Sequence, residues 1–326
     1  MRCFILGSGS WGTALASILA AGGHEVTIWC RRSERAAEID SGEHSLLPGC
    51  RLGEGIRPVT AVECRREEYD LAISALPTQR LREVLNEHGQ RLPLAAPWVS
   101  ASKGVELESF LLPSQVLQEC GVTGGIGILS GPSHAEEVAA GVPTAVVLGH
   151  SDVEVGRWMQ ERISTESFRV YLNSDPVGVE WGGALKNVIA LASGIAIGCG
   201  FGDNTLAALV TRGAVEMARL GVALGGRQGT FSGLSGIGDL IVTCFSEHSR
   251  NRSVGVRIGR GEDPRAVLDS MVQVAEGTYT SRAVVEMCRS LGVEMPIAEE
   301  VHLIVHRGKD VERGTRALLS RSLKEE

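Results

Sequence analysis

The sequence predicts an α/β domain built on a mainly parallel sheet, followed by an all-α domain. Short apolar runs alternate with helical stretches as far as residue 175 or so, which is the pattern of an open sheet with helices on both faces. Beyond that point the strand signals end and the chain is helical. A length of 326 residues also suits two domains. We expect these domains at residues 1–177 and 178–326.

The individual elements follow from the apolar runs and the breaks between them. In the first domain, strands are expected at residues 2–6, 24–29, 71–76, 98–101, 126–130 and 142–148, with helices at 13–20, 80–88 and 153–163. Asn173-Ser174-Asp175-Pro176 is a helix-start signal near the boundary. In the second domain, helices are expected at residues 179–198 and 205–220, and again from the glycine-rich stretch 225–238 to the end.

A glycine-rich turn lies between the first strand and the first helix. Its sequence is Gly7-Ser8-Gly9-Ser10-Trp11-Gly12, and Gly-x-Gly-x-x-Gly in a strand–turn–helix unit is typical of a dinucleotide-binding, Rossmann-like domain. The first glycine allows the tight turn, the second lets a pyrophosphate approach, and the third lets the helix pack on the sheet. The alternative is an ordinary glycine loop, but a second strand follows at the expected distance.

The end of the second strand bears on the choice of cofactor. NAD-selective sites usually place an acidic residue there to bind the ribose hydroxyls. Here the strand is followed by Arg31 and Arg32, and no acid occurs before Glu34. Two arginines suit the 2′-phosphate of NADP, unless they are simply solvated surface residues. We expect both NADP and NAD to be accepted.

Composition limits the classes of partner and compartment. A net charge of −7 argues against nucleic acid or an anionic membrane as a general partner. We see no uninterrupted apolar run of about 18 residues, so no membrane span is expected, and the first strand begins so early that we expect no signal peptide. The eight cysteines are scattered, with no Cys-x-x-Cys pair. This usage favours a reducing cytoplasm and gives no support for a metal site.

Two turns at predicted strand ends carry polar groups that a ligand could use. Lys103 follows the strand at 98–101, and it could bind the nicotinamide ribose or a substrate oxygen, or be a surface lysine. Gly131 and Ser133 follow the next strand, and Ser133 with Glu136 has the spacing of a capping box. These groups could hold a polar ligand or merely start a helix. We interpret His134 as a packed or capping residue rather than an acid or base.

Lys186 is the strongest catalytic candidate. It lies in a helix that is otherwise apolar, in the segment Glu180-Trp181-Gly182-Gly183-Ala184-Leu185-Lys186-Asn187. The two glycines each cost about 1 kcal/mol relative to alanine in a helix interior, so close approach of a cofactor or of neighbouring backbone is expected there. A partly buried lysine suits proton transfer. The alternative is a lysine whose ammonium group reaches the surface from a core helix.

A further polar set follows the glycine-rich stretch. Asp239 and Thr243 are four residues apart and share a helix face. Ser249, Arg250 and Asn251 form a compact set of donors, in which the arginine fork suits phosphate. The alternative is a helix cap with surface charge.

Taken together, these motifs resemble the NAD(P)-dependent glycerol-3-phosphate dehydrogenase family, in its bacterial form. The segments GSGSWGTALA, SKG, SGPSHAEE, WGGALKN, FSGLSGIGDLIVTC and HSRNR occur in this order and spacing, and the resemblance covers nearly the whole chain. It implies reversible hydride transfer between NAD(P)H and dihydroxyacetone phosphate. The product, sn-glycerol 3-phosphate, feeds phospholipid synthesis. A homodimer is one possible assembly.

The resemblance also implies roles for individual residues. Lys186 corresponds to the proton donor and acceptor, with Asp239 as the second catalytic residue. Substrate contacts are implied for Lys103, Gly131, Ser133, Lys186, Asp239, Ser249, Arg250 and Asn251. Cofactor contacts are implied for Gly7, Gly9, Ser10, Trp11, Gly12, Arg31, Arg32, Lys103, Ala135, Arg250, Val274 and Glu276.

The sequence departs from the family pattern at two positions, and two other functions compete with it. Leu46 stands where the family often has Tyr before Leu-Pro-Gly, and Ser253 follows Arg-Asn-Arg where an Arg or bulky residue is common. One alternative is a dehydrogenase of the β-hydroxyacid type, which acts on a carboxylate. The other is a non-catalytic sensor that binds NAD(P)H, against which Lys186 and Asp239 both argue.

Overall fold

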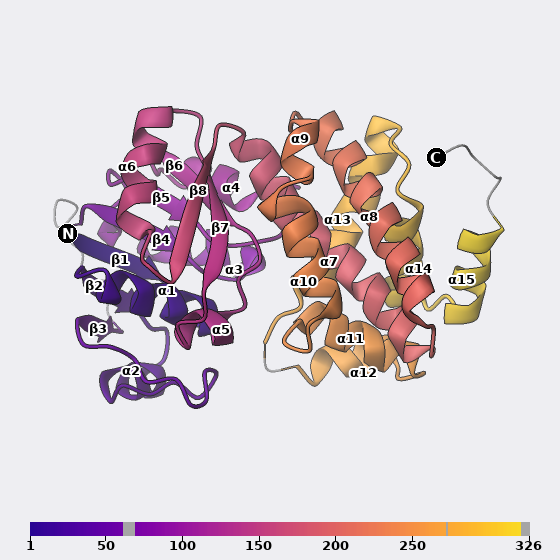
Figure 1. Ribbon diagram of the computed structural model, residues 1–326, viewed down its shortest axis with the longest axis horizontal. Helices are drawn as coiled ribbons and strands as arrows, with labels where there is room; N and C mark the ends of the chain where they lie inside the picture. The colour runs from indigo at the N-terminus through magenta and orange to yellow at the C-terminus, as the bar shows by residue number, and fades with distance from the viewer. Residues whose placement is uncertain (61–68, 272, 321–326) are drawn as a thin grey trace. The chain divides into compact units, whose positions relative to one another are not determined.

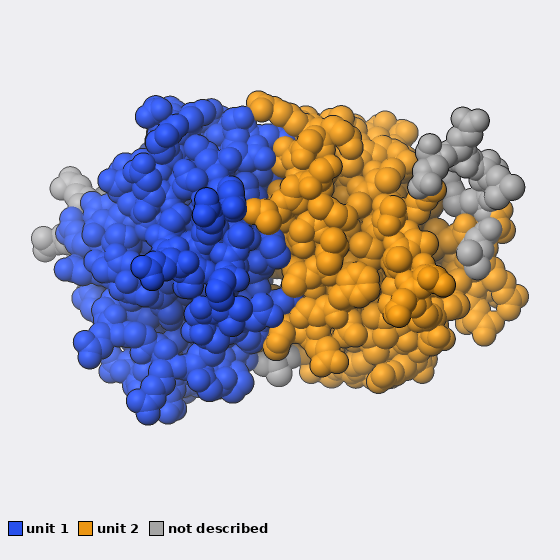
Figure 2. All heavy atoms as spheres, viewed as in Figure 1, with its two compact units in different colours: residues 1–103, 111–180 blue, residues 104–110, 181–326 orange. Residues whose placement is uncertain are grey.

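The computed structural model describes residues 1–60, 69–271 and 273–320 (Figure 1). Cys64, one of the eight cysteines, lies outside these residues. The chain divides into two compact units (Figure 2). Unit 1 comprises Met1–Lys103 and Leu111–Glu180, and unit 2 comprises Gly104–Phe110 and Trp181–Glu326.

Unit 1 is a sheet with helices between its strands. Its described strands pair in the order β3-β2-β1-β4-β5-β6-β7-β8. Their bounds are β1 Arg2–Leu6, β2 Glu25–Trp29, β3 Ile56–Val59, β4 Leu71–Ser74, β5 Trp98–Ser100, β6 Ile126–Ser130, β7 Thr144–Gly149 and β8 Phe168–Asn173. The helices are α1 Ser10–Ala21, α2 Ser33–Asp40, α3 Thr78–His88, α4 Pro113–Glu119, α5 Ala135–Ala139 and α6 Val153–Ile163, with a short 3₁₀ turn at Gly89–Arg91.

The sheet is mainly parallel, which confirms the predicted fold class. The exception is the pair β6 and β7, which is antiparallel with Leu129 opposite Leu148. Two edge strands were not predicted. In β3 the sequence Ile-Arg-Pro-Val is only partly buried, and proline is tolerated in a strand at such an edge. In β8 buried Phe168 and Val170 alternate with exposed Arg169 and Tyr171, as expected for a strand with one covered face.

The central strand β1 has a hydrophobic core on each face. Cys3 and Ile5 belong to one cluster, which includes apolar residues of α1. Phe4 and Leu6 belong to a second cluster, with residues of α3 and α4. All four side chains are fully buried, and burying a large apolar side chain is worth about 1.5–3 kcal/mol. This two-sided burial explains why the strand is a continuous apolar run rather than an alternating one.

From Trp181 on, the described part of unit 2 is helical, which confirms the predicted all-α class of the second domain. The second stretch of unit 2 begins within helix α7 (Pro176–Gly198), whose first residues belong to unit 1. There follow α8 Asp203–Ala223, α9 Gln228–Phe231, a π-helical turn Leu234–Gly238, α10 Asp239–Phe245, α11 Arg250–Gly259, α12 Pro264–Asp269, α13 Glu276–Leu291, α14 Pro296–Arg307 and α15 Val311–Leu319.

The helix-start signal before α7 acts as the sequence predicts, although the helix begins earlier than residue 179. The Asp175 side chain accepts a hydrogen bond from the Gly178 backbone N–H at 2.9 Å. Pro176 is the first helical residue, where its missing N–H costs nothing. The helix α7 therefore begins three residues earlier than the sequence analysis expected.

Helices α7 and α11 approach closely because both carry glycine at their contact. A Cβ atom added at Gly194 would lie 2.2 Å from the Arg252 carbonyl oxygen, and one added at Gly255 would lie 2.3 Å from that of Leu191. Neither position tolerates a side chain. The glycines thus hold the helix of Arg250 directly against the helix of Lys186.

Helix α7 is long and apolar enough to cross a membrane by length and composition alone. In the structure, however, 89% of its apolar window is buried. It is the central helix of unit 2, and burial on all sides accounts for its composition.

Candidate cofactor and substrate sites

The glycine-rich turn has the geometry that each of its glycines was expected to provide. Gly7 has φ +116°, which favours glycine. A Cβ atom at Gly12 would lie 2.0 Å from the Gly7 carbonyl oxygen, so the helix packs directly on the turn. A Cβ atom at Gly9 would meet nothing within 4 Å. The backbone at Gly9 is therefore open, which fits the approach of a pyrophosphate.

The N-terminus of α1 adds hydrogen-bond donors to this opening. Gly9 caps the helix and contributes no side-chain hydrogen bond, while the next intrahelical bond runs from the Thr13 N–H to the Gly9 carbonyl. The backbone amides of Ser10, Trp11 and Gly12 precede that bond, and such amides are the usual ligands of a phosphate at a helix start. The residues present therefore fit a dinucleotide.

The two arginines follow the strand beside the glycine-rich turn. Strands β1 and β2 are parallel, with Leu6 opposite Trp29, so the segments after them leave the same edge of the sheet. Arg31 and Arg32 are both exposed. Glu34 lies in the first turn of α2. This is the place where a Rossmann-like domain holds the adenine ribose.

His44 is a residue of this site that the sequence analysis missed. Its Nε2 donates to the Ser8 carbonyl at 3.1 Å, and its Nδ1 accepts from the Leu46 N–H at 3.2 Å. Burial lowers the pKa of His44, partly offset by the bond to Ser8. A neutral imidazole thus supports the glycine-rich turn. The departure at Leu46 leaves this bond intact, because Leu46 contributes its backbone.

Lys103, Gly131 and Ser133 are brought together at the ends of β5 and β6. Lys103 Nζ donates to the Gly131 carbonyl at 3.0 Å, and Ser133 Oγ donates to the same oxygen at 3.0 Å. Gly131 has φ +130°, and its Cβ position would lie 3.0 Å from the Val146 backbone. The alternative of Lys103 as a merely solvated surface residue therefore does not hold.

The predicted capping box at Ser133 is wrong. Helix α5 begins at Ala135, with His134 in the N-cap position and no side-chain cap. The Ser133 hydroxyl is directed to the Gly131 carbonyl instead. This one-residue shift of the helix start leaves Ser133 in the turn beside Lys103 and makes Ala135 the first helical residue.

In unit 2, Lys186 and Asp239 form a buried ion pair. Lys186 Nζ lies 2.5 Å from Asp239 Oδ1 and 2.8 Å from Thr243 Oγ1. The three residues are 7%, 1% and 4% exposed. The Thr243 hydroxyl donates to the Asp239 carbonyl at 2.6 Å, so it accepts from Lys186. The lysine ammonium is therefore held in place, and its charged form is stabilised by a carboxylate. It does not reach the surface, which excludes the alternative interpretation of Lys186.

Gly182 explains how α7 comes close to Asp239. A Cβ atom at Gly182 would lie 2.6 Å from the Ser235 carbonyl oxygen. Ser235 lies in the π-helical turn that leads directly into α10, and such turns are frequent at functional sites. Of the two reasons expected for this glycine, close approach of neighbouring backbone is the one that the structure shows.

The three predicted phosphate-binding residues have different environments. Ser249 caps α11 and accepts from the Arg252 N–H at 3.2 Å, as the alternative interpretation expected. Arg250 is exposed. Asn251 is buried; its Oδ1 accepts from the Gly277 N–H and its Nδ2 donates to Asn187 Oδ1, each at 2.9 Å. Asn251 therefore joins α7, α11 and α13 at residues next to Lys186, Arg250 and Glu276.

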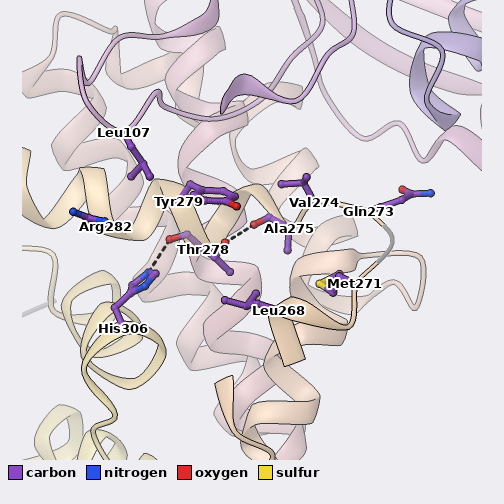
Figure 3. A pocket seen from close by; sticks show the side chains of 10 residues that line it. All are labelled: Leu107, Leu268, Met271, Gln273, Val274, Ala275, Thr278, Tyr279, Arg282 and His306. Atoms are coloured by element: carbon purple, nitrogen blue, oxygen red, sulfur yellow. Dashed lines mark hydrogen bonds between the residues drawn. The ribbon is translucent and has the colours of Figure 1, made fainter. Parts of the chain in front are cut away.

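Val274 lines a cavity of about 420 Å³ in unit 2 (Figure 3). Beside it, the Thr278 hydroxyl donates to the Ala275 carbonyl at 2.8 Å, and His306 Nε2 donates to the Thr278 carbonyl at 2.9 Å. These bonds fix the first turn of α13, where Glu276 is the first residue. Other residues lining the cavity are Leu107, Leu268, Met271, Gln273, Tyr279 and Arg282.

A Rossmann-like unit with an open glycine turn, together with a helical unit holding a buried Lys–Asp pair, defines a nicotinamide-dependent dehydrogenase. Comparison with known proteins gives the family. The models of NAD-dependent glycerol-3-phosphate dehydrogenase match residues 3–155 for the N-terminal part and 175–316 for the C-terminal part. The chain belongs to this family.

Full-length relatives agree with the family models. The chain is 47% identical over 319 residues to glycerol-3-phosphate dehydrogenase [NAD(P)+] of Moorella thermoacetica, covering 97% of this chain and 95% of the relative. Identity to the enzyme of the same name from a Geobacter species is 45%, covering 99% and 98%. The crystal structure of glycerol-3-phosphate dehydrogenase from Coxiella burnetii has a TM-score of 0.91 at 34% identity, covering 98% and 99%.

Proposed function

We propose that the chain interconverts dihydroxyacetone phosphate and sn-glycerol 3-phosphate with NADPH or NADH, and supplies glycerol 3-phosphate for phospholipid synthesis. The observation that carries the chemistry is the buried contact of Lys186 with Asp239 and Thr243. Reduction of a ketone develops negative charge on its oxygen. A preorganised ammonium in a buried site stabilises that charge more than water does.

Lys186 is the proposed proton donor for reduction. The nicotinamide, when bound, supplies the hydride to the carbonyl carbon. Lys186 Nζ gives one proton to the carbonyl oxygen and regains one from solvent after the alcohol leaves. In the oxidation direction the neutral amine accepts the hydroxyl proton. Asp239 holds the ammonium in position and balances its charge, and Thr243 fixes its direction.

The proposed cofactor contacts are those that the family resemblance implies. The turn 7–12 would bind the pyrophosphate, Arg31 and Arg32 would bind the adenine ribose and its 2′-phosphate, and Lys103 and Ala135 would make further cofactor contacts. We also assign cofactor contacts to Arg250, Val274 and Glu276. Exposure of both arginines at the end of β2 supports acceptance of NADP beside NAD.

Arg250 is the proposed ligand of the substrate phosphate. It is the exposed member of its set, at the first turn of α11, where a helix start also favours an anion. Ser249 and Asn251 hold the turn around it, and we assign further substrate contacts to Lys103, Gly131 and Ser133. Phosphate binding is remote from the reacting carbon, so its energy can orient the ketone.

The wider setting of the enzyme follows from the same proposal. We assign cofactor binding to a domain at residues 1–177 and catalysis to one at 178–326, in a cytoplasmic enzyme whose partner is a small molecule. Free thiols at Cys3, Cys30 and Cys244, among the described cysteines, support a reducing compartment. A homodimer is part of the proposal.

An assay with purified protein tests this function. We expect rapid oxidation of NADPH and NADH with dihydroxyacetone phosphate, and none with small 3-keto acids. The opposite preference would favour the β-hydroxyacid type. Cofactor binding without turnover of any phosphorylated ketone would favour the sensor. The family models and relatives support neither alternative.

A further inference from the structure

Glu180 is a buried carboxyl group that the proposed chemistry does not use. Its residue is 4% exposed. Both of its hydrogen bonds come from Ser114: the backbone N–H donates to Oε1 at 2.9 Å, and the hydroxyl donates to Oε2 at 2.5 Å. Among the described residues no cation pairs with it. A buried carboxylate is costly unless paired, so two donors from one residue are its main compensation.

The contact lies where the chain passes between the units. The segment Gly104–Phe110 belongs to unit 2, and the chain returns to unit 1 at Leu111, just before α4. Glu180 is the last residue of unit 1, and α7 continues unbroken into unit 2. Ser114 lies just after the chain returns to unit 1, and Glu180 lies just before the chain leaves it. Their hydrogen bonds therefore join these two stretches of unit 1.

The start of α7 is close to Lys186 along the same helix. Lys186 lies six residues after Glu180 in the same helix, or about 9 Å along its axis. Over so short a distance a helix is stiff, and a change in the direction of its first turn reaches Lys186. Small misplacements of a catalytic group cost rate disproportionately.

We propose that Glu180 is a positioning residue for Lys186: its carboxylate accepts both donors of Ser114 and thereby fixes the first turn of α7, the helix that carries Lys186. The inference rests on the proposed function, because it assigns Lys186 the proton transfer. The ionised carboxylate can accept both Ser114 hydrogen bonds, whereas the protonated group carries a hydrogen on one of its two oxygens. Burial raises the pKa of Glu180 to about 7, an effect that the Ser114 bonds oppose. The ionised form, which accepts both donors, is therefore favoured only above about pH 7.

The test compares kcat for dihydroxyacetone phosphate across pH in four variants. Glu180→Gln offers one acceptor to two donors, so the ratio of wild-type to variant kcat should grow from near unity at about pH 6 to roughly tenfold at about pH 8. Ser114→Ala should lower kcat similarly at the higher pH, and Ser114→Thr, which keeps the hydroxyl, should retain it.

Glu216→Gln is the matched control. Glu216 is also 4% exposed and accepts from the backbone N–H groups of Ile297 and Ala298, at 2.8 and 3.3 Å, within unit 2. Its ratio to wild type should be flat with pH. A kcat ratio for Glu180→Gln that does not change with pH, together with unchanged kcat in Ser114→Ala, would overturn the proposal. The proposed dehydrogenase function would still hold in that case if the wild-type protein reduces dihydroxyacetone phosphate. Should Ser114→Ala fail to fold, the pH ratio of Glu180→Gln alone decides.

Discussion

Replacing Lys186 by methionine separates the chemical role of the ammonium from its structural one. The apolar stem is kept, but the Asp239 carboxylate loses its cation at 2.5 Å. Asp239 is 1% exposed, and its Oδ1 lies 3.3 Å from the Thr243 hydroxyl, which is a neutral group. Removing one partner of a buried ion pair costs about 3–5 kcal/mol. We expect that loss in the free energy of unfolding, and a fall in kcat of about 10²–10⁴-fold.

The double variant Lys186→Met with Asp239→Asn distinguishes the two effects. The double variant also removes the negative charge that Lys186→Met leaves behind. Its loss of free energy of unfolding should therefore be smaller than the sum of the two single losses, with a coupling energy of about 0.5–3 kcal/mol. Turnover should remain as low as in Lys186→Met, because no proton donor has been restored. Urea unfolding and NADPH oxidation measure the two quantities. Near-normal kcat in Lys186→Met, or strict additivity of stability, would refute the reasoning.

Three further predictions address the cofactor turn and the buried carboxyl group. Replacing both Arg31 and Arg32 by alanine should weaken NADPH binding by about 1.5–3 kcal/mol and NADH binding little; equal losses in fluorescence titrations would show that neither reads the 2′-phosphate. Gly12→Ala should lower the free energy of unfolding by about 1–3 kcal/mol, whereas Gly9→Ala should spare it and weaken both cofactors; the reverse pattern would contradict an open backbone at Gly9. Burial raises the pKa of Glu180 in the folded state from 4.5 to about 7. Between these pH values the folded state binds more protons than the unfolded state, so the free energy of unfolding falls as pH rises. The wild-type protein should show this fall, about 3 kcal/mol, and Glu180→Gln should not. The same dependence of the free energy of unfolding on pH in both proteins would contradict the burial effect.

The fold class followed from the sequence because both periodicity and glycine placement are local signals. Continuous apolar runs such as residues 2–6 indicate strands covered on both faces, and the long apolar stretch of α7 indicates a central helix. The orientation of β7 was beyond such signals, because the direction of a strand depends on the path of the chain between strands. The strand β3 was missed because Pro58 argues against a strand unless the edge position is known.

The burial of Lys186 was predictable, but its partner was not. A lone cation in an apolar helix must find compensation, yet Asp239 is 53 positions away in sequence. His44 carried no signal, since a single histidine in a loop has no periodicity or motif. Ser133 failed as a cap because the capping-box spacing does not say whether the hydroxyl bonds forward to the helix or back to Gly131.

The most direct test of the proposed reaction compares phosphorylated and unphosphorylated dihydroxyacetone as substrates of wild type and of Arg250→Ala, with NADH and NADPH in parallel. We expect wild type to prefer the phosphorylated ketone strongly in kcat/KM. Charge-assisted hydrogen bonds of about 1.5–3 kcal/mol each imply that Arg250→Ala loses roughly 10²-fold or more on that ketone and little on the other. The loss should appear in kcat as well as KM, because phosphate binding orients the carbonyl. No turnover of the phosphorylated ketone by wild type, or equal losses on both ketones in Arg250→Ala, would contradict the account.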